Sequence, residues 1–201
     1  MEHFYQNIDG WFSYEWLYKQ AVQEAQDGAV FVEIGSWKGR SSAFLTVEAL
    51  NSGKNISVTC IDTWMGSSEH QEGAECQDET VINGTLYQTF VKNMKPVWGK
   101  FHHLRIDSVD AASLFDDNSV DFLMIDAAHE TELVIQDIEA WLPKMKKGGM
   151  MTGDDCWIGS SPRVAAEKHW QSTEYNFQII ILLQLLSNYG NNTKEKMHII
   201  R

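Results

Sequence analysis

The sequence has few cysteines and few prolines, and each shortage excludes a kind of protein. Its three cysteines are too few and too widely spaced for a disulfide framework or for a zinc site with paired ligands. Sparse free cysteines are typical of a reducing compartment, so we expect a cytoplasmic protein. Three prolines and no low-complexity stretch leave no sign of a linker, and we expect a single domain over residues 1–201.

Positive charge is also scarce. Lys and Arg number 16 against 28 Asp and Glu, which gives a net charge of −12. Nucleic acids and anionic membranes need a dense basic surface, so neither is expected as a partner. The N-terminus has no basic and apolar leader, and the longest apolar run, at 177–186, is too short to cross a bilayer.

Short apolar runs alternate with segments of helical periodicity along the chain. Strands are predicted at 30–34, 56–62, 101–107, 120–126 and 150–155. Two more are predicted in NFQIIILLQ and MHIIR near the end, and the first of these is long enough to be partly helical. Helices are predicted at 12–26, 40–50, 86–94, 109–115, 133–145 and 162–170. This alternation indicates an α/β fold, a doubly wound, mostly parallel seven-stranded sheet with helices on both faces. Residues 1–28 are an N-terminal helical segment, and the polar residues 64–84 are either a lid or a plain loop.

Acidic residues follow one predicted strand after another. They lie at or just beyond the ends of five strands: Glu33, Asp62, Asp107, Asp126, Asp154 and Asp155. The carboxyl ends of parallel strands share one edge of the sheet, where ligands bind. Six carboxylates there disfavour a pyrophosphate and suit a cationic, hydroxyl-rich ligand such as S-adenosylmethionine. We expect Glu33 at the mouth of the sheet, beside the positive charge of that ligand.

The loop after the first strand, in VFVEIGSWKGRSS at 30–42, has glycines four residues apart. The dinucleotide fingerprint G-x-G-x-x-G is missing, which disfavours a dehydrogenase. Gly35 and Gly39 would let the backbone approach a ligand closely. The helix that begins near Arg40 would point its N-terminus at the ligand's carboxylate. Asp62, at the next strand end, is placed to accept hydrogen bonds from two ribose hydroxyls.

Three stretches resemble class I S-adenosylmethionine-dependent methyltransferases: E-I-G-S-W-K-G-R-S at 33–41, I-D-T-W at 61–64 and D-S at 107–108. They are most similar to the branch of macrocin-type and mycinamicin-type sugar O-methyltransferases, and the resemblance spans residues 28–170. It implies a Rossmann-like methyltransferase fold with S-adenosylmethionine as cofactor. The cofactor-binding residues that it implies are Glu33, Gly35, Ser36, Lys38, Gly39, Ser41, Asp62, Trp64, Asp107, Ser108 and Asp126.

Two further stretches, D-A-A-H at 126–129 and G-D-D at 153–155, resemble a metal-binding pattern of the same enzymes. The resemblance implies that Asp126, Asp154 and Asp155 bind a divalent cation and that His129 is the general base. Three carboxylates without a cysteine suit Mg²⁺ or another hard cation better than zinc. The metal would stabilise the alkoxide of an acceptor, with His129 and Asp126 as catalytic residues, and the sulfonium methyl would then transfer in line.

The acceptor is a small molecule that no feature of the sequence names. A hydroxyl on a sugar or on a similar compound is the first candidate, and a catechol-like or caffeoyl-CoA-like aromatic diol is the second. A non-catalytic S-adenosylmethionine-binding protein is the third, and the presence of Asp126, His129, Asp154 and Asp155 disfavours it. The chain is short beside the sugar-modifying enzymes, in parts that often shape the oligomer interface, so assembly as a homo-oligomer stays open.

Overall fold

The structure, a computed structural model, describes residues 1–127, 130–154, 178–181 and 198–200. Its strands are β1 (Val30–Ile34), β2 (Ser57–Asp62), β3 (His102–Arg105), β4 (Val120–Ile125), β5 (Met145–Gly153), β6 (Gln178–Ile181) and β7 (His198–Ile200). Its α-helices are α1 (Glu15–Glu24), α2 (Arg40–Asn51), α3 (Glu79–Ile82), α4 (Leu86–Asn93), α5 (Ser108–Ala112) and α6 (Thr131–Trp141). Short 3-10 helices are η1 (Tyr5–Asn7), η2 (Ser68–His70), η3 (Lys95–Val97) and η4 (Leu142–Lys144).

The strands form one sheet in the order β3-β2-β1-β4-β5-β6-β7, which confirms the predicted doubly wound sheet. Neighbouring strands are parallel except β6 and β7, which are antiparallel. In the centre, Ile34 of β1 lies beside Ile61 of β2 and Ile125 of β4. The carboxyl ends of these three strands therefore meet at one edge of the sheet.

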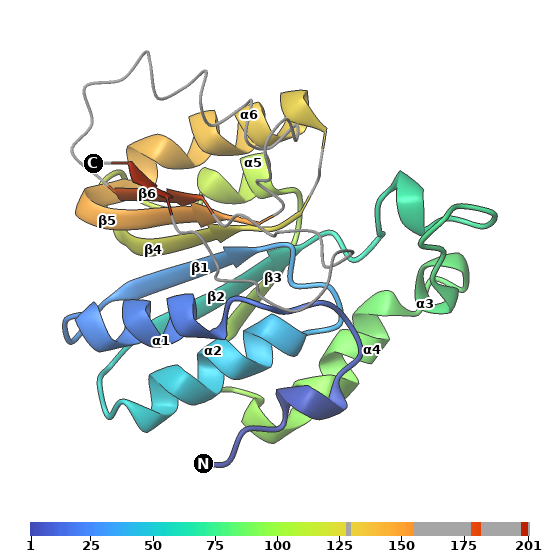
Figure 1. The fold of residues 1–201 in the computed structure, drawn as a ribbon, viewed down its shortest axis with the longest axis horizontal. Helices are drawn as coiled ribbons and strands as arrows, with labels where there is room; N and C mark the ends of the chain where they lie inside the picture. Colours follow the sequence, from blue (N-terminus) through green and yellow to red (C-terminus); the bar gives the residue numbers. More distant parts are fainter. Residues whose placement is uncertain (128–129, 155–177, 182–197, 201) are drawn as a thin grey trace, which may run out of the picture.

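Helices cover both faces of this sheet (Figure 1). On one face α1, α2 and α4 pack over a core that includes Tyr18, Phe44 and Phe90. On the other face α5 and α6 pack over a second core around Val134 and Trp141. Central strands buried on both faces need nearly continuous apolar runs, and β1 and β4 are apolar except for one acid each, Glu33 and Asp121. None of the helices in the described ranges is long and apolar enough to cross a membrane.

Within the described residues the predicted strands and helices are confirmed, but the end of α6 differs from its prediction. The predicted helix over 133–145 ends at Trp141, and residues 142–144 form η4 around Pro143. Proline has no backbone N–H to continue an α-helix, which explains the early end. Strand β5 consequently begins at Met145, before the predicted start at 150. The helix predicted at 162–170 lies outside the described residues.

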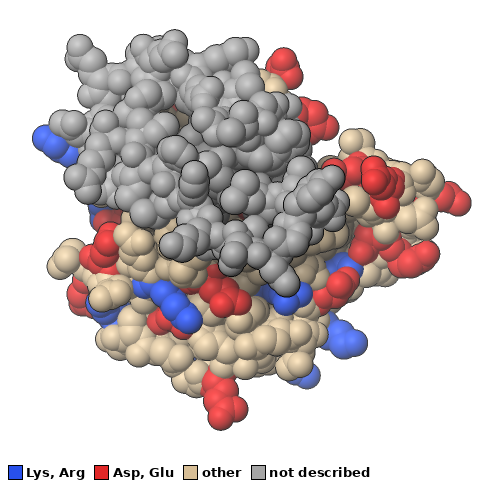
Figure 2. All heavy atoms as spheres, in the orientation of Figure 1, with Lys and Arg blue, Asp and Glu red and all other residues tan. Residues whose placement is uncertain are grey.

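Residues 64–84, here called the projecting segment, extend from the edge where the strands end (Figure 1). The segment was predicted as a loop, but it contains η2 and α3. Acidic side chains gather on it (Figure 2): Glu69, Glu72, Glu75, Asp78 and Glu79. Lys38 anchors the segment, because its Nζ lies 2.6 Å from Asp78 Oδ2 and 2.6 Å from Asp9 Oδ2. The role of this segment as a lid stays a prediction.

Candidate functional site

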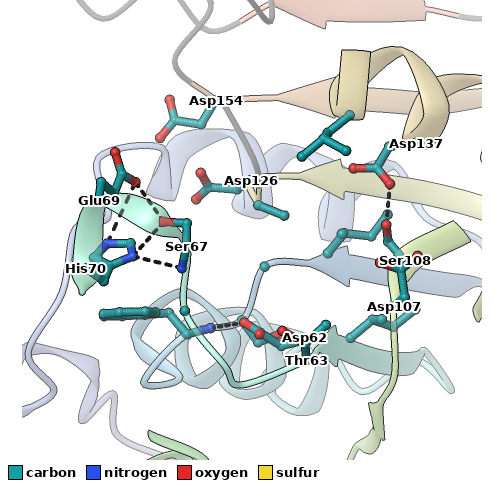
Figure 3. A pocket seen from close by; sticks show the side chains of 18 of the residues that line it. Asp62, Thr63, Ser67, Glu69, His70, Asp107, Ser108, Asp126, Asp137 and Asp154 are labelled. Carbon is teal, nitrogen blue, oxygen red and sulfur yellow. Dashed lines mark hydrogen bonds and ion pairs between the residues drawn. The ribbon is translucent and has the colours of Figure 1, made fainter. Parts of the chain in front are cut away.

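A cavity of about 630 Å³ opens at the carboxyl edge of β1, β2 and β4. Its volume is typical of sites for small molecules and cofactors. Its lining includes Gly35, Ser36, Ser41, Asp62, Asp107, Ser108, Asp126 and Asp154, all of which were predicted site residues. Figure 3 shows Asp107, Ser108 and Asp137 on one side of the cavity and Ser67, Glu69 and His70 on the other. Asp62 and Asp126 lie between these two sides.

Asp62, the last residue of β2, organises the loop after β1. Its Oδ2 accepts a hydrogen bond of 2.8 Å from the backbone N–H of Trp37, and its Oδ1 accepts one of 2.6 Å from that of Trp64. Burial raises the pKa of Asp62, while these backbone N–H groups lower it. Each carboxylate oxygen has a second lone pair, so Asp62 can still accept from the hydroxyls of a ligand.

The two glycines of this loop serve the packing of the chain. Gly35 has a φ of +89°, and a Cβ there would lie 1.8 Å from the carbonyl oxygen of Asp126. Gly39 has a φ of +91°, and a Cβ there would lie 3.0 Å from Met94 Sδ and 3.1 Å from Phe90. We expected Gly39 to let the backbone approach a ligand closely. Gly39 instead faces α4 and does not line the cavity, so that expectation is wrong about where this residue lies.

Glu33 also differs from its predicted position at the mouth of the sheet. It is fully buried and does not line the cavity. Tyr18 donates to its Oε1 at 2.8 Å, and Ser36 and Ser42 donate to its Oε2. Burial raises the pKa of Glu33, whereas these hydroxyl donors lower it. Its polar partners come from α1, α2 and the loop between β1 and α2. Hydroxyl groups of the protein therefore surround the carboxylate that was expected to lie beside the positive charge of a ligand.

Lys38 and Trp64 were predicted to bind the cofactor, but neither lines the cavity. Lys38 is buried between the carboxylates of Asp9 and Asp78. Trp64 is buried against Phe90, with ring centroids 4.5 Å apart, and its Nε1 donates to the carbonyl oxygen of Trp37 at 2.8 Å. Both side chains therefore hold the loops around the cavity in place through contacts outside the cavity.

Asp126 and Asp154 lie just beyond the ends of the neighbouring strands β4 and β5, as predicted. The N–H of Asp126 donates to Ile34 at 2.9 Å, and that of Asp154 donates to Ile125 at 3.2 Å, so backbone bonds fix both. The hydroxyl of Tyr14 donates to Asp126 Oδ2 at 2.7 Å. Burial, followed by the charge of Asp126, raises the pKa of Tyr14 well above its usual value, so Tyr14 remains a donor.

The donor atoms here fit a hard cation in part. Asp126 and Asp154 turn carboxylate oxygens toward the same cavity (Figure 3), and such oxygens are the ligands that Mg²⁺ prefers. His129 and Asp155, the predicted base and third ligand, lie outside the described residues. Within the described ranges, no three His, Cys, Asp or Glu side chains are grouped closely enough to hold a metal.

Sequence reasoning missed three residues of this region. Tyr14 is 112 residues away from Asp126 in the sequence, so no local pattern links the two. His70 lies in the polar projecting segment, where no sequence motif marks it. His70 Nδ1 is 2.7 Å from Ser67 Oγ, and its ring packs on that of Trp37, with centroids 4.3 Å apart. Asp137 is a buried residue of α6, and no local pattern distinguishes it from the other acids of that helix.

The lining is strongly acidic. Its carboxylates are Asp62, Glu69, Asp107, Asp126, Glu130, Asp137 and Asp154. Among the described lining residues, Arg40 is the single lysine or arginine, and its Nη1 donates to the carbonyl oxygen of Gly10 at 2.7 Å. Such a field attracts cationic groups and repels anions.

Solved structures share this fold at low sequence identity. The O-methyltransferase NovP is 14% identical with a TM-score of 0.60, over 78% of this chain and 70% of that chain. A protein from Staphylococcus aureus, provisionally named a caffeoyl-CoA O-methyltransferase, is 17% identical with a TM-score of 0.55, over 84% and 78%. A provisionally named rRNA methylase from Clostridium thermocellum is 13% identical with a TM-score of 0.56, over 91% and 94%. At these identities the likeness concerns the fold alone.

The sequence also matches a protein family. No curated protein matches the chain significantly. The family described as "Methyltransferase domain" matches residues 32–156, which is more than half of the chain. The match runs from within β1 to beyond β5 and includes the cavity-lining acids that follow these strands. The chain therefore belongs to this family of methyltransferase domains.

Proposed function

We propose that this protein is an S-adenosylmethionine-dependent O-methyltransferase that methylates a hydroxyl group of a small molecule. The observation that carries the proposal is the placement of Asp62 and Asp126 in one cavity at the carboxyl edge of a methyltransferase fold. Asp62 suits the ribose of the donor, and Asp126 suits the reacting hydroxyl. The two acids end strands on either side of β1, which leaves the centre of the cavity for the sulfonium.

The polarity of the lining supports one orientation of the donor. Arg40 begins α2, so its guanidinium and the positive end of the helix can hold the donor's carboxylate. The ribose hydroxyls then face Asp62, and the adenine lies toward Asp107 and Ser108. The reacting methyl group is thereby turned toward Asp126 and Asp154.

The acceptor would react on the side of Asp126 and Asp154. These two residues, together with Asp155, would hold Mg²⁺ or a similar cation, which when bound supplies positive charge that favours the alkoxide. His129 would take the proton of the hydroxyl, because imidazole, with a reference pKa of about 6.5, is the side chain best suited to accept a proton near neutrality. Tyr14 would hold the Asp126 carboxylate in position through its hydrogen bond.

The charge of the lining narrows the acceptor class. Seven carboxylates against one arginine would repel a phosphorylated acceptor, whether a coenzyme A ester or an RNA. A neutral or amine-bearing sugar therefore fits best, in agreement with the macrocin-type and mycinamicin-type branch. An uncharged aromatic diol is the second candidate, because Trp11 and Trp37 add aromatic surface to the cavity.

Donor binding tests the core of this proposal. Isothermal titration calorimetry should show that S-adenosylmethionine binds the wild-type protein and that Asp62→Ala weakens binding about tenfold or more, since two hydroxyl contacts are lost. Asp116→Ala, which removes an exposed acid outside the lining, is the matched control and should bind like the wild type. Equal affinities for Asp62→Ala and Asp116→Ala would remove the ribose role.

Assays of methyl transfer test the need for a metal and the role of His129 as general base. Activity on neutral sugars, amino sugars, catechols and coenzyme A esters should be highest for an unphosphorylated acceptor. EDTA should abolish that activity and Mg²⁺ should restore it, whereas indifference to chelation would reject the metal. His129→Ala should lower turnover while donor affinity stays near that of the wild type, and unchanged turnover would reject the general base.

A further inference from the structure

Three aromatic side chains that line the cavity, Trp11, Trp37 and His70, are here called the aromatic triplet. The centroid of the His70 ring lies 4.3 Å from that of Trp37 and 6.3 Å from that of Trp11. The three rings come from the loop before α1, the loop after β1 and the projecting segment. Trp11 is 69% exposed and belongs to neither core cluster, so the packing of the core does not explain its position.

Trp37 is held at the cavity wall in an unfavourable backbone conformation. Its φ is +49°, in the left-handed region that residues with a side chain rarely adopt. The hydrogen bonds of its backbone N–H to Asp62 and of its carbonyl oxygen to Trp64 Nε1 impose this conformation. Such strain is retained where surrounding contacts fix it, and it is concentrated at functional sites. The fold therefore presents the Trp37 indole to the cavity at a cost in stability.

The aromatic triplet has no positive charge of its own. The backbone N–H of Ser67 donates to His70 Nδ1 at 3.3 Å, and a protonated imidazole has no nitrogen that could accept this bond, so the ring is neutral. The carboxylate of Glu69, which also lines the cavity, lies beside it, with Oε1 3.8 Å from His70 Nε2. Aromatic faces next to a carboxylate attract cations, because the face of an aromatic ring is electrostatically negative.

A cation of the protein already lies over one of these rings. Lys38 Nζ is 5.7 Å from the centroid of the Trp37 ring, within the range of about 6 Å for cation–π interactions. The same ammonium bridges Asp9 and Asp78, which belong to the two segments that carry Trp11 and His70. Lys38 thus ties together the segments that carry the aromatic triplet, and its charge is neutralised by two acids.

We propose that the aromatic triplet and Glu69 form a cation subsite that binds a protonated amino group of the acceptor. The acceptor would then be an amine-bearing hydroxy compound, such as an amino sugar, and not a neutral sugar or an uncharged diol. This inference rests on the proposed function, in which the adenine of the donor lies toward Asp107 and Ser108. Figure 3 shows Glu69 and His70 on the opposite side of the cavity, which leaves their side to the acceptor. A neutral compound would gain only apolar contact with the rings.

Two small molecules of the same shape and different charge test the inference. Choline has a quaternary nitrogen where 3,3-dimethylbutan-1-ol has a carbon atom. Each is titrated into the full chain saturated with S-adenosylhomocysteine, and the indole N–H signals of Trp11 and Trp37 are followed by NMR. Choline should bind about tenfold more tightly than the uncharged alcohol, as expected of a cation held by desolvated aromatic rings.

Matched variants assign this preference to the subsite. Trp11→Leu should weaken choline binding about fivefold, and Trp98→Leu, which removes an exposed ring outside the lining, should not change it. Glu69→Gln should weaken the binding of choline and leave that of the alcohol unchanged. Glu72→Gln, which alters an exposed acid of the same segment outside the lining, is its control and should bind like the wild type.

The outcomes separate this inference from the function on which it rests. If S-adenosylhomocysteine binds but choline and the alcohol bind equally, or Trp11→Leu behaves like Trp98→Leu, the inference is overturned and the methyltransferase proposal stands. If choline shifts the two indole signals only when S-adenosylhomocysteine is absent, the subsite belongs to the donor, and the inference is again overturned. If S-adenosylhomocysteine does not bind at all, the proposed function fails first.

Discussion

The hydroxyl of Tyr14 donates a 2.7 Å hydrogen bond to Asp126, a residue that lies 112 positions later in the sequence. One helical turn further on, Tyr18 donates a 2.8 Å hydrogen bond to the buried carboxylate of Glu33. The start of α1 thus supplies one hydroxyl to Asp126, which lines the cavity, and a second hydroxyl to Glu33, which is buried in the sheet. The two tyrosines form a matched pair that separates effects on activity from effects on stability.

Tyr14→Phe should lower the turnover number several-fold, because the carboxylate of Asp126 loses the group that orients it. The same change should cost about 1 kcal/mol of unfolding free energy, the usual contribution of one hydrogen bond. Tyr18→Phe should cost about 1–3 kcal/mol, because buried Glu33 loses a donor, and it should leave turnover near the wild-type value. Steady-state kinetics and urea unfolding measure the two quantities, and equal turnover numbers for the two variants would contradict this assignment.

Gly35→Ala should destabilise the protein far more than Gly28→Ala. The two glycines have similar φ values of +89° and +84°, so the left-handed backbone penalty of about 1–2 kcal/mol applies equally to both. A Cβ at Gly28 would meet nothing within 4 Å, whereas a Cβ at Gly35 would lie 1.8 Å from the Asp126 carbonyl oxygen. The unfolding midpoint in urea measures the difference, and similar midpoints would show that β1 and β4 separate easily at this edge.

Lys38→Met should loosen the projecting segment while the rest of the fold stays intact. The ammonium bridges Asp9 and Asp78, and although burial lowers the pKa of Lys38, the hydrogen bonds to these acids raise it overall, so the charge is retained. Methionine keeps the apolar stem but leaves both acids without their cation. Hydrogen exchange should accelerate in residues 64–84, with Lys92→Met, an exposed change on α4, as the control. Unaltered exchange in the segment would show that Lys38 does not anchor it.

Asp137→Asn should stabilise the fold near neutral pH, although it alters the cavity. The folded-state pKa of Asp137 is about 6 against an ordinary value of 3.8, so folding disfavours the ionised form. The resulting cost is absent below about pH 4, grows as the pH rises to about 6, and is complete above that. At about 1.4 kcal/mol per unit of pKa, and with part of the gain offset by a weaker bond to Ser108, the variant should be about 1–2 kcal/mol more stable at pH 7.5. Urea unfolding of both proteins from pH 4 to 7.5 measures the gap, and a gap that does not widen with pH would refute this cause.

The central sheet could be predicted from the sequence because parallel strands buried on both faces leave an unmistakable pattern of apolar runs. The acids of the cavity followed from the same reasoning, since Asp62, Asp107, Asp126 and Asp154 end strands that share one edge. For Glu33 this reasoning failed, because it lies within β1 and one residue before its end. Its side chain points into the packed face of α1 and α2 and away from the edge.

Other parts of the site depend on contacts that no local pattern records. The hydrogen bond from Tyr14 requires α1 to pack across the sheet, and the bond between Ser108 and Asp137 requires α5 to lie against α6. Gly39 was read as an opening for a ligand, yet its lack of a side chain makes room for Met94 and Phe90. The glycine spacing drew attention to Gly39, but the neighbours of this residue are known only from the tertiary packing.

The match to the family begins at residue 32, inside β1, whereas the first helix lies entirely before it. A recombinant fragment that begins at that boundary would contain every acid of the cavity. It would lack Tyr14 and Tyr18, whose hydroxyls donate to Asp126 and Glu33. Glu33 would then face the solvent or an empty groove where α1 had been. The full chain should therefore be more stable than such a fragment, because Tyr14 and Tyr18 lie before the matched residues.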